Sequence, residues 1–278
     1  MSTYQNSSYQ GSAYENIEVS VDDPVCVIRL NRPDKLNALT YGMLAEIRSV
    51  IDAAATDPSV VGIVITGNGR GFCSGLDADV LKATTEAGSS RRSEPDPNEL
   101  PGMFSYLLRV PKPVIAAVNG VAAGGGLVLA LMADVRIAGP SAAFTTIFSK
   151  RGLTAEHGLS WIMPRMMGPG RALDLLWTSR KIGADEAYRI GMVEHLSGDA
   201  DPVEQAIAYI RELSVTVSPA SIADAKAMVY RHVGMGYAEA LPEIDIATWA
   251  ALDRPDSTEG AVSLIERRAP NFPRLGSG

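Results

Sequence analysis

Three consecutive glycines, Gly124 to Gly126, lie in an apolar run that reads AAGGGLVLALM from Ala122 to Met132. Each glycine inside a helix costs about 1 kcal/mol relative to alanine, so three in succession predict a place where another group approaches the backbone closely. The run carries no polar side chain. The 278 residues of the chain can bury a large core, in one large domain or in a domain with a smaller appendage.

Strand and helix patterns alternate through the first part of the chain. Two β-rich runs between Ile17 and Leu30, separated by Asp22, Asp23 and Pro24, predict a hairpin. Apolar residues at helical spacing from Met43 to Ala54 predict a helix, which leads into the strand VVGIVI. The same rhythm returns in the helical stretch MFSYLLRV, the strand at 114–118, the glycine-led helix and a strand that starts at Asp134. Repeated units of this kind predict an α/β fold.

The two ends of the chain differ from this pattern. Residues 1–14 are predicted to form a flexible tail, and residues 15–204 form the predicted core. Beyond Arg180 the pattern becomes mainly helical, with candidate helices at 184–190, 202–215, 221–230 and 256–266, and we place a helical carboxy-terminal region at 205–278. The stretch from Lys82 to Pro101 is rich in Ser, Pro, Glu and Gly and predicts a surface loop, either plainly solvated or a lid over a site.

Composition excludes several classes of function. A net charge of −7 and a pI near 5.1 give no basic surface for nucleic acid. The two cysteines, Cys26 and Cys73, and the three histidines show no metal-ligand spacing, so we expect no metal site and no disulfide framework. The amino terminus does not resemble a signal peptide, and the apolar run at 121–133 is shorter than the roughly 20 residues that span a bilayer. We therefore expect a cytoplasmic protein that makes no membrane contact.

A second glycine-bearing turn, GNGRGFCSGLDADVL from Gly67 to Leu81, also follows a strand. Two such turns can direct two backbone N–H groups at one point, and a helix amino terminus adds positive potential there. This arrangement predicts a site for a negatively charged oxygen, although glycine turns made only for tight packing would give a similar pattern.

These stretches resemble the crotonase, or enoyl-CoA hydratase/isomerase, superfamily over residues 17–272. The resemblance depends on LNRPDKLNALT at 30–40, GFCSGLD at 71–77, KPVIAAVNGVAAGGGLVLAL at 112–131, the following AD at 133–134, and STEGAVSLIERRAPNF at 257–272. It implies a crotonase-type spiral of ββα units with a helical carboxy-terminal trimerisation region. It also implies a homo-trimer or a dimer of trimers that acts on acyl-CoA thioesters, with no cofactor beyond the CoA of the substrate.

The resemblance also implies roles for particular residues. The N–H groups of Leu76 and Gly125 would hold the thioester oxygen as it becomes an enolate, and each such donor contributes about 3 to 4 kcal/mol to catalysis. The groove for substrate and CoA would be lined by Lys35, Leu36, Ala38, Ser74, Gly75, Leu76, Asp77, Gly124 and Gly125. For the side chain of Asp77 we favour another role, as the cap of the helix that follows it.

Hydratases of this family use two glutamates, and this chain has Val128 and Phe148 at the corresponding positions. Neither side chain can transfer a proton. Glu156 lies where other branches of the family, including dienoyl-CoA isomerases, carry a catalytic aspartate, so it is the candidate acid or base.

Alternative interpretations remain open for the residues near Glu156. Thr154 has the character of an N-cap, which would place Glu156 in the first turn of a helix, where acids are favoured. His157 is either a second polar group of the pocket or a structural or solvent-facing side chain. Arg151 either lies near the pocket or, as we favour, is a surface charge. The segment 161–168, WIMPRMMG, predicts core and pocket wall.

The function predicted from the sequence is that of an acyl-CoA enzyme that stabilises a thioester enolate. Resemblance alone gives the name enoyl-CoA hydratase and a role in fatty acid metabolism. The residues favour Glu156-dependent isomerisation, hydration or hydrolysis over the two-glutamate mechanism. The rival hypothesis is a non-catalytic subunit that binds acyl-CoA.

Overall fold

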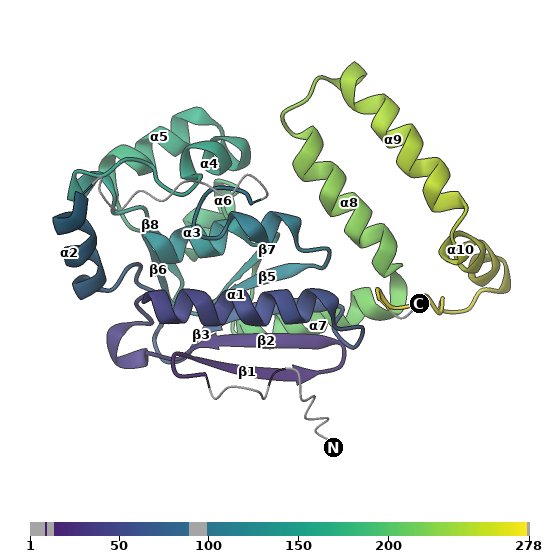
Figure 1. Cartoon of the computed structure of the whole chain (residues 1–278), viewed down its shortest axis with the longest axis horizontal. Helices are drawn as coiled ribbons and strands as arrows, with labels where there is room; N and C mark the ends of the chain where they lie inside the picture. The colour runs from purple at the N-terminus through teal and green to yellow at the C-terminus, as the bar shows by residue number, and fades with distance from the viewer. Residues whose placement is uncertain (1–8, 10–13, 89–98, 277–278) are drawn as a thin grey trace.

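Two sheets of mostly parallel strands organise the protein, for which a computed structural model describes residues 9, 14–88 and 99–276. The larger sheet has the order β1-β2-β3-β5-β7-β10 and the smaller one the order β4-β6-β8-β9 (Figure 1). The strands are β1 (Ile17–Asp22), β2 (Val25–Leu30), β3 (Gly62–Gly67), β4 (Gly71–Cys73), β5 (Val114–Val118), β6 (Val121–Ala123), β7 (Val135–Ala138), β8 (Ala143–Thr145), β9 (Ile182–Gly183) and β10 (His195–Leu196). The predicted α/β fold class is confirmed.

The predicted hairpin forms the edge of the larger sheet. Strands β1 and β2 pair antiparallel, with Ile17 opposite Leu30, and the neighbouring pairs from β2 to β10 are parallel. All residues of β3 and β5 are buried. Continuous apolar runs of this kind are expected for parallel strands that are covered on both faces.

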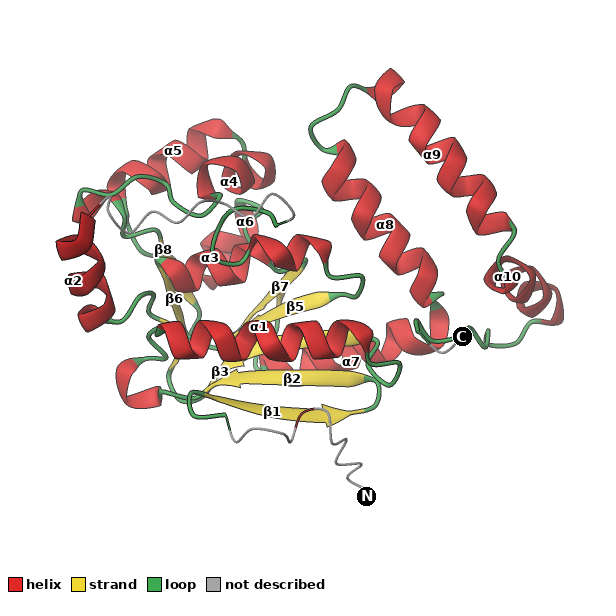
Figure 2. Ribbon diagram, in the orientation of Figure 1, coloured by secondary structure: helices red, strands yellow, loops and turns green. Residues whose placement is uncertain are grey.

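Helices cover the two faces of the larger sheet (Figure 2). Helix α1 (Tyr41–Thr56) begins at Thr40, whose hydroxyl accepts the N–H of Met43 at 3.1 Å, and it buries the stripe predicted between Met43 and Ala54. Helix α7 (Pro202–Thr216) packs on the other face. Its Ile210 lies so close to Gly62 that a β-carbon there would be 2.9 Å away. The core is therefore layered as helix, sheet and helix.

Several shorter helices surround the smaller sheet: α2 (Ala78–Ala87), α3 (Gly125–Met132), α4 (Leu159–Met167), α5 (Pro169–Thr178) and α6 (Ala184–Arg189). The loop predicted at 82–101 is wrong in its first part, because α2 continues to Ala87; residues 89–98 lie outside the described residues. The helix predicted for MFSYLLRV is instead a 3-10 helix, η4 (Ser105–Arg109). Two further 3-10 turns are η2 (Pro33–Lys35) and η5 (Ser149–Arg151).

The carboxy-terminal helices extend to one side of the sheets, as Figures 1 and 2 show. They are α8 (Pro219–His232), α9 (Tyr237–Leu252) and α10 (Pro255–Glu266). The four helices predicted after Arg180 are confirmed as α6, α7, α8 and α10, whereas α9 was not predicted. Large apolar side chains of α9 and α10 are exposed, among them Tyr237, Ile246, Trp249, Leu264 and Ile265.

Most of the predicted tail, residues 1–8 and 10–13, lies outside the described residues. Tyr9 is described and is buried against the core. Among the helices of the described part, none has the length and apolar character needed to cross a membrane.

Candidate active site

The two glycine turns meet at one point because their strands are neighbours. Strand β4 pairs in parallel with β6, and each strand leads into its turn at the same end of the smaller sheet. At Gly75 the backbone has a φ of +94°, and a β-carbon there would lie 2.8 Å from the carbonyl oxygen of Ala123 and 3.3 Å from the nitrogen of Gly125. Only glycine lets the two turns approach this closely.

The three glycines of the triplet occupy different structural positions. Gly124 is the N-cap of α3 and has a φ of +50°. A β-carbon on Gly126 would lie 2.1 Å from the carbonyl oxygen of Cys73, so α3 packs directly on the backbone of β4. Gly125, between them, is the first residue of the helix. The close approach predicted from the triplet is therefore confirmed for the backbone of the neighbouring strand and turn.

Two backbone donors at this junction lack a protein acceptor. Among the described residues, the N–H groups of Leu76 and Gly125 donate to no other group of the chain. Gly125 lies at the amino end of α3, whose eight residues are all buried, so the helix dipole acts there in a poorly solvated environment. Unpaired donors of this kind favour a negatively charged oxygen.

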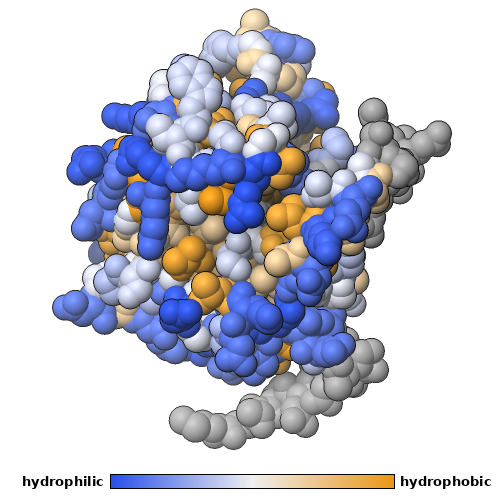
Figure 3. All heavy atoms as spheres, turned by 90° about the vertical axis from the view of Figure 1, so that its left-hand side faces the viewer, coloured by the Kyte–Doolittle hydropathy of each residue, from blue (hydrophilic) through white to orange (hydrophobic). Residues whose placement is uncertain are grey.

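A pocket of about 130 Å³ opens over these two donors. Figure 3 views the molecule from the side of α2 and α5, where apolar atoms lie in a recess bordered by hydrophilic residues. The residues that line the pocket are Ser74, Gly75, Leu76, Leu81, Met103, Gly124, Gly125, Ile147, Phe148, Arg151, Leu153, Glu156 and His157. Glu156 supplies the single carboxylate among these described lining residues.

The side chains of Glu156 and His157 are both partly exposed in the pocket, at 36% and 31%. The Nε2 atom of His157 lies 3.8 Å from Oε2 of Glu156. Burial lowers the pKa of His157, and the neighbouring carboxylate opposes this shift by favouring the charged ring. The site thus combines a carboxylate with an imidazole whose neutral form is favoured.

The proposed cap at Thr154 is wrong. Helix α4 begins at Leu159 with Gly158 as its N-cap, and Glu156 lies in the turn before it. In this turn His157 has a φ of +52° and Gly158 a φ of +88°. A dipole interaction within the first turn of α4 therefore does not account for Glu156.

Val128 and Phe148, the positions at which the resemblance predicts a departure from hydratases, have different surroundings. Val128 is fully buried one turn into α3, where it belongs to the hydrophobic core. Phe148 is buried and contributes to the wall of the pocket. The pocket wall at Phe148 is therefore apolar, and Val128 lies outside the residues that line the pocket.

The segments predicted to bind substrate lie side by side. The N–H of Ser74 donates to the carbonyl of Leu36 at 2.9 Å, and its hydroxyl donates to the carbonyl of Lys35 at 3.2 Å. The Lys35 side chain is exposed, whereas Ala38 is buried. The two segments are therefore in contact beside Leu76, although Lys35, Leu36, Ala38 and Asp77 are not among the residues that line the pocket.

The side chain of Asp77 is occupied by contacts within the protein. It caps α2 by accepting the N–H of Asp79 at 3.1 Å, and it accepts Nη1 of Arg32 at 2.9 Å. The backbone N–H of Asp79 and the guanidinium of Arg32 lower the pKa of Asp77. The capping role favoured for this residue is confirmed.

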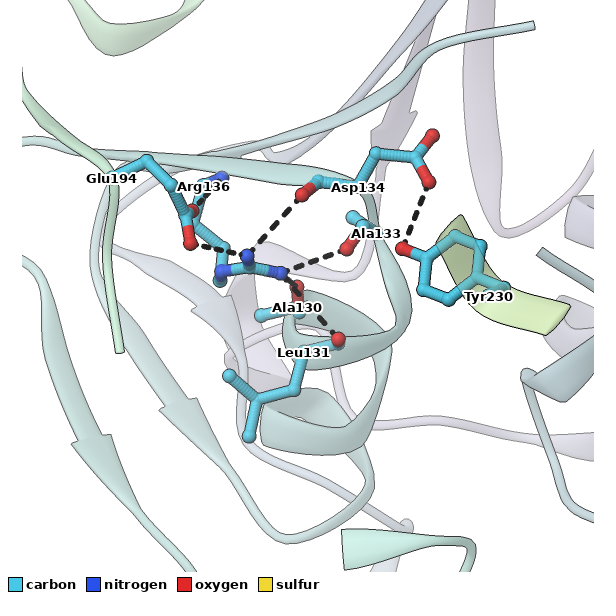
Figure 4. A network of polar contacts seen from close by, with 7 residues as sticks. All are labelled: Ala130, Leu131, Ala133, Asp134, Arg136, Glu194 and Tyr230. Carbon is cyan, nitrogen blue, oxygen red and sulfur yellow. Dashed lines mark hydrogen bonds and ion pairs between the residues drawn. The ribbon is translucent and has the colours of Figure 1, made fainter. Parts of the chain in front are cut away.

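A buried arginine holds the far end of α3 (Figure 4). The Nη1 atom of Arg136 donates to the carbonyl of Ala133 at 2.7 Å and, less closely, to those of Ala130 and Leu131. Its Nη2 atom donates to Glu194 at 2.6 Å. These bonds satisfy carbonyls at the carboxy end of the helix whose amino end carries Gly125.

Four residues that line the pocket had no predicted role, and two interpretations were open for a fifth. The four are Leu81, Met103, Ile147 and Leu153. Arg151, for which a surface charge was favoured over a place near the pocket, is exposed and also lines the pocket. Ile147 has a φ of +60°, a rare conformation for a β-branched residue that stores backbone strain. The sequence gives no local signal for a strained isoleucine at this place.

The two cysteines and the described metal-ligating side chains form no additional reactive or metal site. Cys26 and Cys73 are free and buried, and burial raises the pKa of each thiol to about 12. Over residues 14–88 and 99–276 no group of three His, Cys, Asp or Glu side chains is arranged to hold a metal ion.

Comparison with known proteins gives one consistent family. The family model described as enoyl-CoA hydratase/isomerase matches residues 21–274. A protein of Rhodobacter capsulatus described as a probable enoyl-CoA hydratase is 35% identical over 266 residues, which cover 94% of this chain and 98% of that protein. An enoyl-CoA hydratase of Alternaria alternata is 32% identical over 269 residues, which cover 95% of this chain and 89% of that protein.

Solved structures agree in fold. An enoyl-CoA hydratase from Bacillus anthracis superposes with a TM-score of 0.84 at 27% identity, with 95% of this chain and 100% of that chain covered. An enoyl-CoA hydratase subunit I from Geobacillus kaustophilus gives a TM-score of 0.83 at 30% identity, with 96% and 100% covered. The architecture is therefore shared over nearly the whole chain.

Proposed function

The chain belongs to the enoyl-CoA hydratase/isomerase family, and on this premise we propose that it converts an acyl-CoA thioester through an enolate held by the N–H groups of Leu76 and Gly125. The observation that carries the proposal is that Glu156 is the single carboxylate among the described residues of the pocket into which these two donors open. Acyl-CoA is the substrate class that fits the family.

The two donors supply the electrostatic part of catalysis. In the enolate the negative charge resides on the former carbonyl oxygen, and two N–H groups that lack other acceptors stabilise this charge more than the neutral carbonyl. No water needs to reorganise around the oxygen, because the donors are already fixed by the glycine turns.

Glu156 supplies the proton transfer. In an isomerisation, its carboxylate removes a proton from the carbon next to the thioester carbonyl, and the electron pair moves to the carbonyl oxygen. The same carboxyl group then returns the proton two carbons farther along the chain as the oxygen charge collapses. One acid suffices for this sequence. In a hydration, Glu156 would instead take the proton of a water that adds to the double bond and would return it to the enolate.

The lining of the pocket favours a one-acid mechanism over the two-glutamate mechanism. Phe148 presents an aromatic ring where a second acid would be needed, and Val128 is buried in the core. The same two residues are the observation that favours the second candidate function, a subunit that binds acyl-CoA without converting it. No cofactor beyond the CoA of the substrate is required in either case.

The carboxy-terminal helices complete the proposal with an oligomer, a homo-trimer or a dimer of trimers. Exposed apolar side chains on α9 and α10, including Trp249 and Ile265, form surface that a monomer would leave in water. A second copy of the chain would bury it, and closed symmetric assemblies are the usual solution.

The decisive experiment measures the products formed from 2-trans-enoyl, 3-enoyl and saturated acyl-CoA thioesters, resolved by mass and by double-bond position. A gain of water, a moved double bond at constant mass, or free CoA separates hydration, isomerisation and hydrolysis. The parent is compared with Glu156→Gln and with a matched control, Glu204→Gln, which changes an exposed glutamate of α7.

We expect turnover by the parent and by the control, and a loss of about 100-fold or more in kcat for Glu156→Gln. If Glu156→Gln retains parental activity, the assigned proton transfer is wrong. If the parent binds the thioesters and converts none of them, the binding-subunit alternative replaces the enzyme.

A further inference from the structure

Arg151 brings a permanent positive charge to the pocket that contains Glu156. Of the described residues that line this pocket, Arg151 is the only lysine or arginine and Glu156 the only carboxylate. Most of the other lining residues are glycines or apolar side chains, such as Phe148 and Leu153. Apolar groups cannot replace the water that a guanidinium loses when a ligand fills the pocket, so an unpaired arginine would oppose the binding of a hydrocarbon ligand.

The turn that carries Arg151 is fixed by hydrogen bonds on both sides of the residue. Arg151 is the last residue of η5, and its N–H donates to the carbonyl of Phe148 at 2.8 Å. The same carbonyl accepts the N–H of Leu153 at 3.0 Å. Because Phe148 itself forms part of the pocket wall, the backbone of Arg151 is held beside that wall.

The two residues before Arg151 direct their side chains to α5. The hydroxyl of Ser149 donates to the carbonyl of Leu176, and Nζ of Lys150 donates to the carbonyl of Ser179 at 3.0 Å. Of these three successive polar residues, only Arg151 lines the pocket. The turn is therefore fastened to the body of the protein by its neighbours, and Arg151 is left to face a ligand.

The guanidinium of Arg151 has no hydrogen-bond or ion-pair partner among the described residues. Two other arginines of this region are engaged. Arg165 donates to the carbonyl of Trp161 at 2.8 Å and lies 4.3 Å from the centre of its ring, and Arg180 pairs with two carboxylates. Arg151 and Glu156 line the same pocket and yet form no ion pair, so the pocket keeps two separate, opposite charges.

A guanidinium is best satisfied by a carboxylate, which it binds with two parallel hydrogen bonds. The thioester oxygen is assigned to the N–H groups of Leu76 and Gly125, so Arg151 remains for a second anionic group. The pocket has a volume of about 130 Å³, below the roughly 300 to 1,000 Å³ of complete ligand sites, and therefore suits a short acyl group. Because the carboxylate of Glu156 repels another anion, a second carboxylate needs a cation beside it to enter the pocket.

We propose that the acyl group of the substrate ends in a carboxylate and that Arg151 binds this group. The substrate is then a short dicarboxylic acid that is joined to CoA through one of its two carboxyl groups. This inference rests on the proposed function for the position of the thioester, and it adds the substrate class. Arg151 determines specificity and takes no part in proton transfer.

Binding of matched pairs of saturated thioesters, measured by calorimetry, tests the inference without requiring turnover. Pentanoyl-CoA is compared with glutaryl-CoA, hexanoyl-CoA with adipyl-CoA, and CoA alone is included because its phosphates are the other anionic groups of the ligand. The variants are Arg151→Met, which removes the charge, and Arg151→Lys, which keeps the charge without the planar guanidinium. Arg171→Met is the matched control, because Arg171 is exposed on α5 and does not line the pocket. Turnover of the matching 2-trans-enoyl pairs is measured in parallel.

We expect the parent to bind at least one dicarboxylic thioester about tenfold or more tightly than its monocarboxylic counterpart, as a charge-assisted hydrogen bond predicts. Arg151→Met should lose this preference and keep the Kd values of CoA and of the monocarboxylic thioesters within about twofold. Arg151→Lys should retain part of the preference, and Arg171→Met should behave like the parent.

Equal affinity of the parent for both members of each pair would overturn the inference. An equal loss of affinity for all ligands in Arg151→Met, CoA included, would also overturn it, because the guanidinium would then bind the phosphates of CoA. If monocarboxylic enoyl thioesters are converted and a distal carboxylate gives no advantage, the inference fails and the proposed function stands. If a distal carboxylate strengthens binding through Arg151 but no thioester is converted, the proposed enzyme fails and the carboxylate site stands.

Discussion

The α-carbon of Gly75 lies against the peptide nitrogen of Gly125, so close that a β-carbon on Gly75 would be 3.3 Å from that nitrogen. The two residues are 50 positions apart in the chain. Parallel pairing of β4 with β6 brings them together, and the absence of both side chains allows the contact. The position of each backbone donor therefore depends on the other turn.

Gly75→Ala is expected to separate the two donors. The new methyl group would also lie 2.8 Å from the carbonyl oxygen of Ala123, which is backbone and cannot rotate away, and alanine is strained at a φ of +94°. We expect kcat/KM for a good acyl-CoA substrate to fall by about 100-fold or more, because a displaced donor no longer fits the enolate oxygen. Steady-state kinetics, with circular dichroism to verify folding, measure the effect.

Gly170→Ala is the control for this change, because a β-carbon on Gly170 in α5 meets open space. It should retain parental kcat/KM. Parental activity in Gly75→Ala would show that the junction of the two turns does not set the geometry of catalysis.

Arg136→Met is expected to destabilise the protein by about 3 kcal/mol, since it removes the bonds to the last carbonyls of α3 and leaves Glu194 without its buried partner. The free energy of unfolding from urea titration measures the loss. Arg180→Met provides the comparison, because Arg180 pairs with Asp174 and Glu186 at the surface and its removal should cost less than about 1 kcal/mol. Equal losses in the two variants would contradict a special role for the cap of α3.

Asp77→Asn is expected to lower stability near neutral pH but much less in acid. The pKa of Asp77 is held below its ordinary value of 3.8 by the backbone N–H of Asp79 and the guanidinium of Arg32. The unfolded chain therefore takes up this proton first as the pH falls, so the stabilisation is complete above about pH 4 and is lost as the pH falls through the lowered pKa. Asparagine keeps the capping oxygen and removes the charge.

Unfolding free energies of the parent and Asp77→Asn at pH 7 and pH 3 test this prediction. The difference between the two proteins should shrink at pH 3. The exposed Asp199→Asn serves as the control for the loss of a surface charge. A difference that stays constant between the two pH values would show that the charge of Asp77 does not stabilise the fold.

Local patterns in the sequence predicted the parts of the fold that local physics determines. The hairpin at 17–30 and the buried stripe of α1 follow from side-chain periodicity, and the turns at Gly75 and Gly124 depend on backbone conformations that residues other than glycine rarely adopt. For this reason the backbone of the candidate site could be located before the structure was known.

The errors have equally physical origins. Thr154 and Glu156 imitate the start of a helix, but the left-handed conformations of His157 and Gly158 delay α4 to Leu159. Helix α9 was missed because its large apolar side chains, such as Trp249, are exposed and form no buried stripe. Met103 and Ile147 line the pocket because segments that are distant in the sequence pack together, and no local sequence pattern encodes that packing.

His157→Asn is expected to make stability less sensitive to mild acid. Burial lowers the pKa of His157 from its ordinary value of 6.5, and Glu156 opposes this shift only in part. Between the lowered pKa and 6.5 the unfolded chain binds a proton that the folded chain does not, so stability should fall as the pH drops through this window and should level off below it.

Asparagine tolerates the φ of +52° at position 157 and carries no titrating group. Unfolding free energies from pH 7.5 to pH 5 should therefore decline less in His157→Asn than in the parent. An identical slope in the parent and His157→Asn would mean that the imidazole beside Glu156 is as well solvated in the folded protein as in the unfolded chain, and the pocket would then lack the desolvation that strengthens its two backbone donors.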